Sequence, residues 1–161
     1  MYKKLMMEAV KEALKAQSKG EVPIGAVIAD LEGRIISKAH NTVINDNNVS
    51  SHAEINAIKK ASSTLNNYRL TNTVLYSTVE PCVMCMGAVI HARIKRIVFG
   101  THDIKWGAAG SLYSFHENRR LNHMPEVVSG VLEDECRKLI QNFFKEKRRQ
   151  AKEKRTCPVL P

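Results

Sequence analysis

Residues 73–85 read TVLYSTVEPCVMC, an apolar run rich in β-branched residues that leads directly into a Cys-x-x-Cys pair. Residues 73–77 predict a buried strand. A helix is expected to open at Cys82, because Pro81 fits the first helical turn, where its missing N–H leaves no bond unmade. This order of elements predicts two thiols after the end of a strand, on the first turn of a helix.

The two cysteines can share one metal ion. Cys82 and Cys85 are three residues apart and so lie on one face of the expected helix. Thirty residues upstream the chain reads HAE (residues 52–54), which adds an imidazole and a neighbouring carboxylate. Three protein ligands with an open fourth position are the arrangement of a catalytic zinc. We predict that His52, Cys82 and Cys85 bind one Zn²⁺ and that Glu54 stays uncoordinated and transfers protons.

Each motif alone has a simpler interpretation. A single Cys-x-x-Cys also occurs in redox proteins and in zinc knuckles. A structural zinc site would need a fourth ligand, but Cys136 and Cys157 lie far downstream without a pair-like spacing. Ser51-x-x-Glu54 matches a helix capping box, which would give Glu54 a structural role. The conjunction of both motifs, with Pro81 directly before the first cysteine, favours the catalytic site.

Composition indicates one domain of an intracellular protein. The 161 residues suffice for one buried core. Four cysteines, two of them in a metal-like pair, do not form a secreted disulfide framework. Glu8, Lys11 and Glu12 interrupt the charged start of the chain before an apolar segment develops, and no stretch is as long as a membrane span. We expect a cytoplasmic protein without a membrane anchor.

Hydrophobic periodicity predicts alternating strands and helices. Helices are expected from about residue 5 to Gly20, from His52, from Cys82, and from about residue 133 into the C-terminal tail. The expected strands span residues 22–28, 35–39, 73–77, 96–100 and 127–128. Between the first two, residues 30–33 predict a hairpin turn with Gly33 at positive φ. The alternation indicates an α/β layer fold around one sheet.

Much of the net charge of +9 lies near the C-terminus. Residues 145–155 carry seven basic and two acidic side chains, directly after Phe143 and Phe144. Bases stack on aromatic faces while Lys and Arg neutralise phosphates, so this combination suits nucleic acid. It equally suits a solvated helix with Leu139, Ile140 and Phe143 as its buried stripe. The two interpretations are compatible.

The chain resembles the bacterial tRNA-specific adenosine deaminases of the cytidine deaminase-like superfamily, from Glu21 to about Arg149. Zinc nucleobase deaminases share the H-x-E and P-C-x-x-C motifs. The matching strings are EVPIGAV (21–27), HAEI (52–55), NYRL (67–70), EPCVMC (80–85), GA with IHARI (87–94) and GAAGSL (107–112). The chain departs from the family at Trp106, where a smaller residue is common, and at Met86. Residues 157–161 match no motif.

This resemblance implies a three-layer α/β/α domain at residues 1–150, with a central mixed five-stranded sheet, and a basic, flexible tail at residues 151–161. It implies zinc-dependent hydrolytic deamination of adenosine to inosine at the wobble position of a tRNA anticodon. One Zn²⁺ per subunit, bound by His52, Cys82 and Cys85, and Glu54 as proton shuttle are expected. Family members form homodimers whose sites are completed near the subunit interface, so a dimer is expected too.

The resemblance also assigns substrate contacts. Asn41 matches a residue that hydrogen-bonds the target nucleotide, and the backbone N–H of Ala53 a contact to the base. Val22 and Val79 match pocket walls, and Asp103 matches a residue near the RNA backbone. The C-terminal helix is expected to grip the anticodon loop through Phe143, Phe144, Arg148 and Arg149.

Two other functions fit part of the sequence. A zinc deaminase of a free base, nucleoside or nucleotide, of guanine or cytosine type, keeps the metal site but gives no role to the basic tail. A non-enzymatic, zinc-stabilised RNA-binding module keeps the tail but gives no role to Glu54.

Overall fold

Five strands form one mixed sheet in a computed structural model that describes residues 1–156. The elements in chain order are α1 (Tyr2–Ser18), β1 (Gly25–Asp30), β2 (Ile35–His40), α2 (Ala53–Leu65), β3 (Thr73–Val79), α3 (Val83–His91), β4 (Arg96–Thr101), a 3₁₀ turn (Phe115–Glu117), β5 (Glu126–Val128) and α4 (Glu133–Thr156). The strand order is β2-β1-β3-β4-β5. β1 is antiparallel to β2 and β3, whereas β3, β4 and β5 are parallel.

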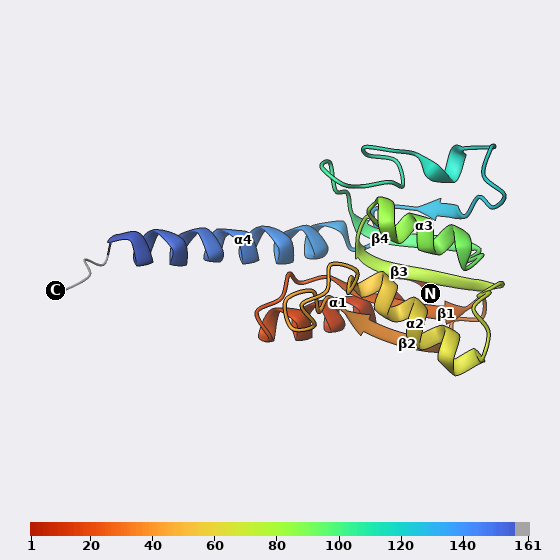
Figure 1. Cartoon of the computed structure of the whole chain (residues 1–161), viewed down its shortest axis with the longest axis horizontal. Coiled ribbons are helices and arrows are strands. Elements are labelled where there is room, and N and C mark those ends of the chain that lie inside the picture. The colour runs from red at the N-terminus through yellow and green to blue at the C-terminus, as the bar shows by residue number, and fades with distance from the viewer. Residues whose placement is uncertain (157–161) are drawn as a thin grey trace.

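Helices cover both faces of the sheet, which confirms the predicted three-layer α/β/α fold (Figure 1). On one face α2 and α3 bury small and apolar side chains against β1, β3 and β4. On the other face α1 and the first turns of α4 pack on the opposite sides of the same strands. The fully buried pattern of β3 follows from this arrangement, because both of its faces are covered.

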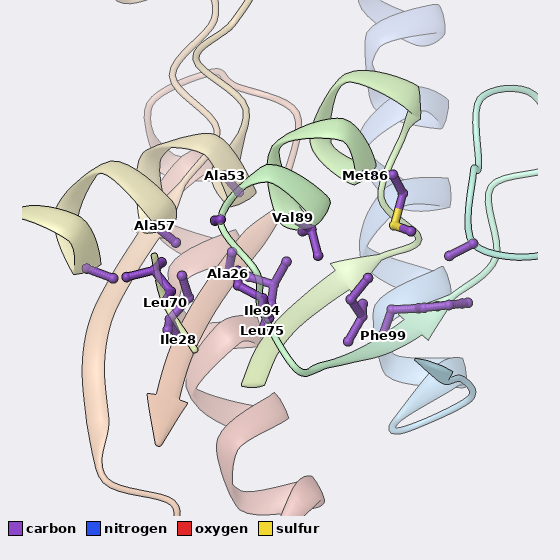
Figure 2. Close-up of a cluster of buried hydrophobic side chains, with 14 of the residues drawn as sticks. Ala26, Ile28, Ala53, Ala57, Leu70, Leu75, Met86, Val89, Ile94 and Phe99 are labelled. Atoms are coloured by element: carbon purple, nitrogen blue, oxygen red, sulfur yellow. The ribbon is translucent and has the colours of Figure 1, made fainter. Parts of the chain in front are cut away.

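The core beneath α2 and α3 determines how close these helices come to the sheet (Figure 2). Ala53 and Ala57 allow α2 to lie close to Ala26 and Ile28. Met86 is fully buried in the same cluster and reaches towards Phe99 (Figure 2). The bulk of Met86, a departure from the family pattern, therefore fills space in the core.

Two glycines allow helices to contact the other face closely. A Cβ at Gly25 would overlap the carbonyl oxygen of Ala9 in α1. A Cβ at Gly100 would overlap the thiol of Cys136 in α4. These contacts hold the first turns of α4 against β4, next to the end of the sheet where the metal motifs lie.

The predicted hairpin is confirmed, since Gly33 has φ +87° and the Asp30 carboxylate accepts a hydrogen bond from the Arg34 N–H at 2.9 Å. The first strand was predicted to start at residue 22 but starts at Gly25. A local hydrogen bond from the Ile24 N–H to the Val22 carbonyl, 2.8 Å long, bends the chain before the strand.

Helix α4 extends well beyond the sheet (Figure 1). Its 24 residues span about 36 Å at 1.5 Å per residue. Phe143 is its last buried residue within the part that the structure describes. The predicted boundary at residue 150 falls inside this helix, so residues 151–156 continue it, and residues 157–161 lie outside the described residues. No helix among residues 1–156 is both long and apolar enough to cross a membrane.

Candidate metal centre and active site

Two helix starts bring the predicted ligands together. His52 is the residue directly before α2, and Cys82 is the residue directly before α3, with Cys85 on the first turn of that helix. His52 and Cys82 have extended backbone angles, so each side chain leaves the start of its helix at the end of the sheet. Because α2 and α3 pack side by side on one face, the three side chains meet.

The distances fit zinc. The Nδ1 atom of His52 lies 3.7 Å from the Cys82 sulfur and 3.6 Å from the Cys85 sulfur. Tetrahedral zinc, with its usual bonds to nitrogen and sulfur, separates such ligands by about 3.6 Å. All three ligand atoms lie within 4.8 Å of one another, and no other comparable group of His, Cys, Asp and Glu occurs among residues 1–156. Three protein ligands therefore leave the fourth position for water or substrate.

The interactions within the cluster shift the pKa values of the two thiols in opposite directions. A hydrogen bond from Cys85, supported by His52, outweighs burial and lowers the pKa of Cys82 to about 4. The same hydrogen bond, together with burial, raises the pKa of Cys85. A hydrogen bond with Cys82 raises the pKa of His52 against the effect of burial. The lowered pKa of Cys82 favours the thiolate, the form of cysteine that binds zinc.

Glu54 lies beside the metal cluster and is buried. Its side chain is 3% exposed, and burial is the main cause that raises its pKa. Its Oε1 accepts a hydrogen bond from the Ser77 hydroxyl at 3.4 Å. The capping-box interpretation of Glu54 is wrong, because α2 begins at Ala53 with His52 as its N-cap, one residue later than the box requires. A buried carboxyl group with a raised pKa is suited to taking up and returning a proton.

Pro81 does not occupy the first helical turn as predicted. It precedes Cys82, the N-cap of α3, so the proline lies just outside the helix. Its carbonyl instead accepts a hydrogen bond from the Ala108 N–H at 2.9 Å, and Cys82 forms an isolated β-bridge with Gly107. The segment at residues 80–82, called here the metal loop, is therefore hydrogen-bonded to the glycine-rich loop at residues 107–110.

Glu80 connects these loops, and the sequence did not single it out. Its buried carboxylate accepts backbone hydrogen bonds from Ala109 (2.9 Å), Ser111 (3.0 Å) and Asp103 (3.1 Å), and another from the Ser111 hydroxyl. Burial would raise the pKa of Glu80, but these hydrogen bonds lower it overall. Gly107 packs so closely on this carboxylate that a Cβ would overlap it.

Replacing Glu80 with alanine is expected to lower the free energy of unfolding by about 3 kcal/mol, because buried N–H groups then lose their acceptor. Urea denaturation of the zinc-loaded protein measures this loss. Glu32→Ala is the matched control: that side chain is 70% exposed, so its removal is expected to change stability by less than about 0.5 kcal/mol. Equal losses for the two variants would contradict the role given to Glu80.

Asn41 is held by a second buried carboxylate. Its Nδ2 donates to the Glu21 Oε2 at 3.0 Å, and Glu21 also accepts from the backbone and side chain of Asn45 at 2.7 and 2.8 Å. Glu21 is fully buried, and the sequence pattern marked it only as the first residue of a matching string. The arrangement fixes the direction of the Asn41 amide.

Four predicted substrate residues line one cavity of about 600 Å³. They come from four different segments: Val22 before β1, Val79 at the end of β3, Asp103 after β4, and Phe144 on α4. Ala53 lies apart from them, fully buried at the first turn of α2. The fold thus assembles a hollow at the ends of β3 and β4 from residues far apart in sequence.

The other predicted residues of α4 do not line this cavity. Phe143 is buried, contacts the Phe144 ring edge-to-face at 5.5 Å, and has the Lys147 ammonium over its ring. Arg148 lines an adjoining hollow. Arg149 is paired with Glu146 and Glu153 along the helix, both at 2.6 Å, which raises its pKa. Surface pairs of this kind exchange readily, so they do not prevent a phosphate contact.

Comparisons with known proteins agree with this geometry. Residues 1–101 match the cytidine and deoxycytidylate deaminase zinc-binding region. The chain is 44% identical to a tRNA-specific adenosine deaminase of Haemophilus influenzae, covering 92% of this chain and 86% of that protein. It is 47% identical to a tRNA-specific adenosine deaminase of Bacillus subtilis, covering 91% of each.

A solved structure from a study of A-to-I editing by tRNA:A34 deaminases at the wobble position of transfer RNA superimposes with a TM-score of 0.81. It is 40% identical in sequence and covers 84% of this chain and 98% of that one. The similarity thus includes the sheet, the zinc motifs and most of the remaining chain. The chain therefore belongs to the zinc-binding cytidine and deoxycytidylate deaminase family and, within it, to the tRNA-specific adenosine deaminases.

Proposed function

We propose that this protein converts adenosine to inosine by hydrolysis at the wobble position of a tRNA anticodon. The observation that carries the proposal is the His52, Cys82 and Cys85 cluster with Glu54 beside it. A cavity lined by Val79 and Thr101, at the ends of β3 and β4, and by Phe144 of the basic helix α4 lies towards the same end of the sheet. The high identity to tRNA-specific adenosine deaminases over nine tenths of the chain supports the choice of substrate.

Zn²⁺ bound by His52, Cys82 and Cys85 would supply an activated water molecule as nucleophile. Glu54 would accept a proton from the water that adds to C6 of the adenine and pass it to N1 of the ring. The same carboxylate would then take the second proton, from the new C6 hydroxyl, and deliver it to the departing amine as the C6–N6 bond breaks, so that water and adenosine give inosine and ammonia. Burial of Glu54 favours both steps, because bulk water cannot take the proton in its place.

The remaining predicted residues would hold the RNA. Asn41, whose amide is oriented by Glu21, would hydrogen-bond the nucleotide, and the Ala53 N–H would contact the base. Val22 and Val79 provide apolar walls, while Arg148 and Arg149 provide charge for phosphates. An anticodon loop is a suitable substrate, because its splayed bases need little unstacking before they enter a pocket.

We also propose that the protein is a homodimer that acts in the cytoplasm, where its tRNA substrate would be found. Val83, Leu112 and Tyr113 are exposed apolar side chains close to the metal loop, and a second subunit would cover them. Sedimentation equilibrium of the zinc-loaded protein should give twice the mass of the chain. A monomer that is fully active on RNA would contradict the dimer.

The substrate assignment is tested by comparing kcat/KM for an anticodon stem-loop with adenosine at the wobble position and for free adenosine. We expect the stem-loop to be preferred by about 10²-fold or more, since stacked bases contribute about 1–3 kcal/mol each. Inosine in the RNA and released ammonia are the readouts. A stem-loop whose only adenosine is paired in the stem is the control and should not react.

The rival functions predict other results. Equal activity on free adenosine and on the stem-loop, or faster release of ammonia from guanine or cytidine, would favour a deaminase of free bases or nucleosides. Tight RNA binding without any inosine would favour a non-enzymatic RNA-binding module. Either result would overturn the proposed function.

A further inference from the structure

The most exposed aromatic surface near the metal centre belongs to the single tryptophan of the chain. Trp106 is 67% exposed, although a tryptophan gains more than almost any residue from burial. A lone exposed apolar residue needs no explanation. Trp106, however, lines the cavity that also holds Val22 and Val79, so its position bears on what that cavity binds.

The backbone around Trp106 is held in place while its ring stays free. The Asp103 carboxylate accepts hydrogen bonds from the N–H groups of Lys105 at 3.0 Å and of Trp106 at 3.2 Å. The next residue, Gly107, donates its N–H to the Asp103 carbonyl at 2.8 Å and packs against buried Glu80. A rigid support of this kind presents an aromatic face with little entropy left to lose on binding.

Trp106 also lies close to the metal. Gly107 forms a β-bridge with the ligand Cys82, and bridged Cα atoms are about 5 Å apart. One further peptide unit adds 3.8 Å. The Cα of Trp106 therefore lies within about 9 Å of the Cα of Cys82. With the target base at the metal, Trp106 would contact an adjacent nucleotide of the loop and not the distant stem of the RNA.

The surroundings of Trp106 indicate a polyanionic occupant. Its cavity adjoins a second hollow of about 660 Å³, and the two share Lys105, Ile140, Gln141 and Phe144. The charged side chains of the second hollow are Lys105, Lys145 and Arg148, all of them basic. Aromatic faces in one hollow, continuous with cations in the adjoining hollow, are the pattern of single-stranded nucleic-acid grooves.

We propose that Trp106 stacks on an unpaired RNA base next to the reacting adenosine, with Phe144 across the same cavity. This inference rests on the proposed function and adds a contact that fixes the register of the loop. Stacking accepts any base, because every base has a π-face. Trp106 therefore contributes binding energy and holds the loop in position, but it does not select the identity of the base. The Asp103 turn acts here as the support that aims the ring.

The intrinsic fluorescence of the protein reports on this contact directly, because Trp106 is its sole tryptophan. The anticodon stem-loop is titrated into the zinc-loaded protein while tryptophan emission and the anisotropy of labelled RNA are followed together. We expect quenching that saturates with binding. Stem-loops with an abasic residue directly before or directly after the target adenosine should bind, and one of them should lose most of the quenching.

Kinetics provide the second readout. Trp106→Ala should raise KM for the stem-loop by about 10–100-fold, as expected for a stacked base, with a smaller effect on kcat. Trp106→Phe should restore most of the affinity while it removes the emission. Leu14→Ala on α1, which shortens an exposed apolar side chain outside both hollows, should leave KM unchanged.

The outcomes separate this inference from the proposed function. If the RNA binds and is deaminated but the emission does not change, or if neither abasic substitution affects the quenching, the inference fails and the function stands. An unchanged KM for Trp106→Ala, or a changed oligomeric state of that variant by sedimentation, would also overturn it. If the stem-loop does not bind at all, both proposals fail.

Discussion

Glu54→Ala is expected to lower kcat by about 10²–10⁴-fold, the usual contribution of a positioned general acid–base group. The variant should keep its zinc, since Glu54 is not among the ligand atoms that converge on the site. It should also keep its fold. A carboxylate that is 3% exposed stabilises little by itself, and its replacement by alanine removes a buried polar group. Zinc analysis, urea denaturation and single-turnover deamination of the stem-loop measure the three properties.

Glu54→Gln sharpens this test, because it keeps the shape and the hydrogen bond from Ser77 but cannot carry the proton. Both variants should therefore be equally inactive, whereas a purely positional role would leave the glutamine variant active. If the inactive Glu54 variants have an unchanged or higher free energy of unfolding, Glu54 serves catalysis and not the stability of the fold. Substantial deamination by the alanine variant would falsify the proton-transfer role.

The metal site could be predicted from the sequence because its geometry is local. One helical turn fixes Cys82 relative to Cys85. His52 lies at the start of a helix that the neighbouring residues predict. The strands could be predicted too. A strand buried on both faces, such as β3, gives a continuous apolar run, whereas a strand with one face in solvent gives alternation. These features require only short-range periodicity and the chemistry of the donor atoms.

The carboxylates that support the site could not be predicted in this way. Glu80 receives its hydrogen bonds from backbone groups more than twenty residues away, and Glu21 from two asparagines about as far along the chain. Neither partner set has a sequence pattern, because backbone N–H groups look the same in every residue. Only the folded loops show that two acidic residues are fully paired in the interior.

Errors in element boundaries had a similar origin. The capping box and the proline position were each displaced by one residue, since the helices α2 and α3 begin where the metal side chains leave them. The last helix, predicted to run from about residue 133 into the tail, does so and reaches residue 156 within the described residues. Intrahelical pairs such as Arg149 with Glu146 and Glu153 stabilise a solvated helix beyond residue 150, where no apolar stripe remains to mark it.

Cys85→Ala is expected to abolish both zinc binding and turnover. The affinity for zinc comes from three protein ligands. The binding free energy of zinc sites built on cysteine and histidine is about 10–16 kcal/mol in total. The loss of one thiolate should therefore weaken binding by at least about 10²–10³-fold. Metal analysis after dialysis should find less than one tenth of the zinc of the unsubstituted protein, and deamination should be undetectable.

Cys136→Ala is the matched control, because Cys136 is as fully buried as Cys85 but lies in the core on the opposite face of the sheet. It should lose about 1–2 kcal/mol of stability from lost packing and keep its zinc and activity. A chelator should lower the melting temperature of this control, since zinc stabilises the folded state that binds it. The chelator should not affect Cys85→Ala. If that variant retained zinc, the metal would be held by residues other than His52, Cys82 and Cys85, and the chemistry assigned to Glu54 would lose its nucleophile.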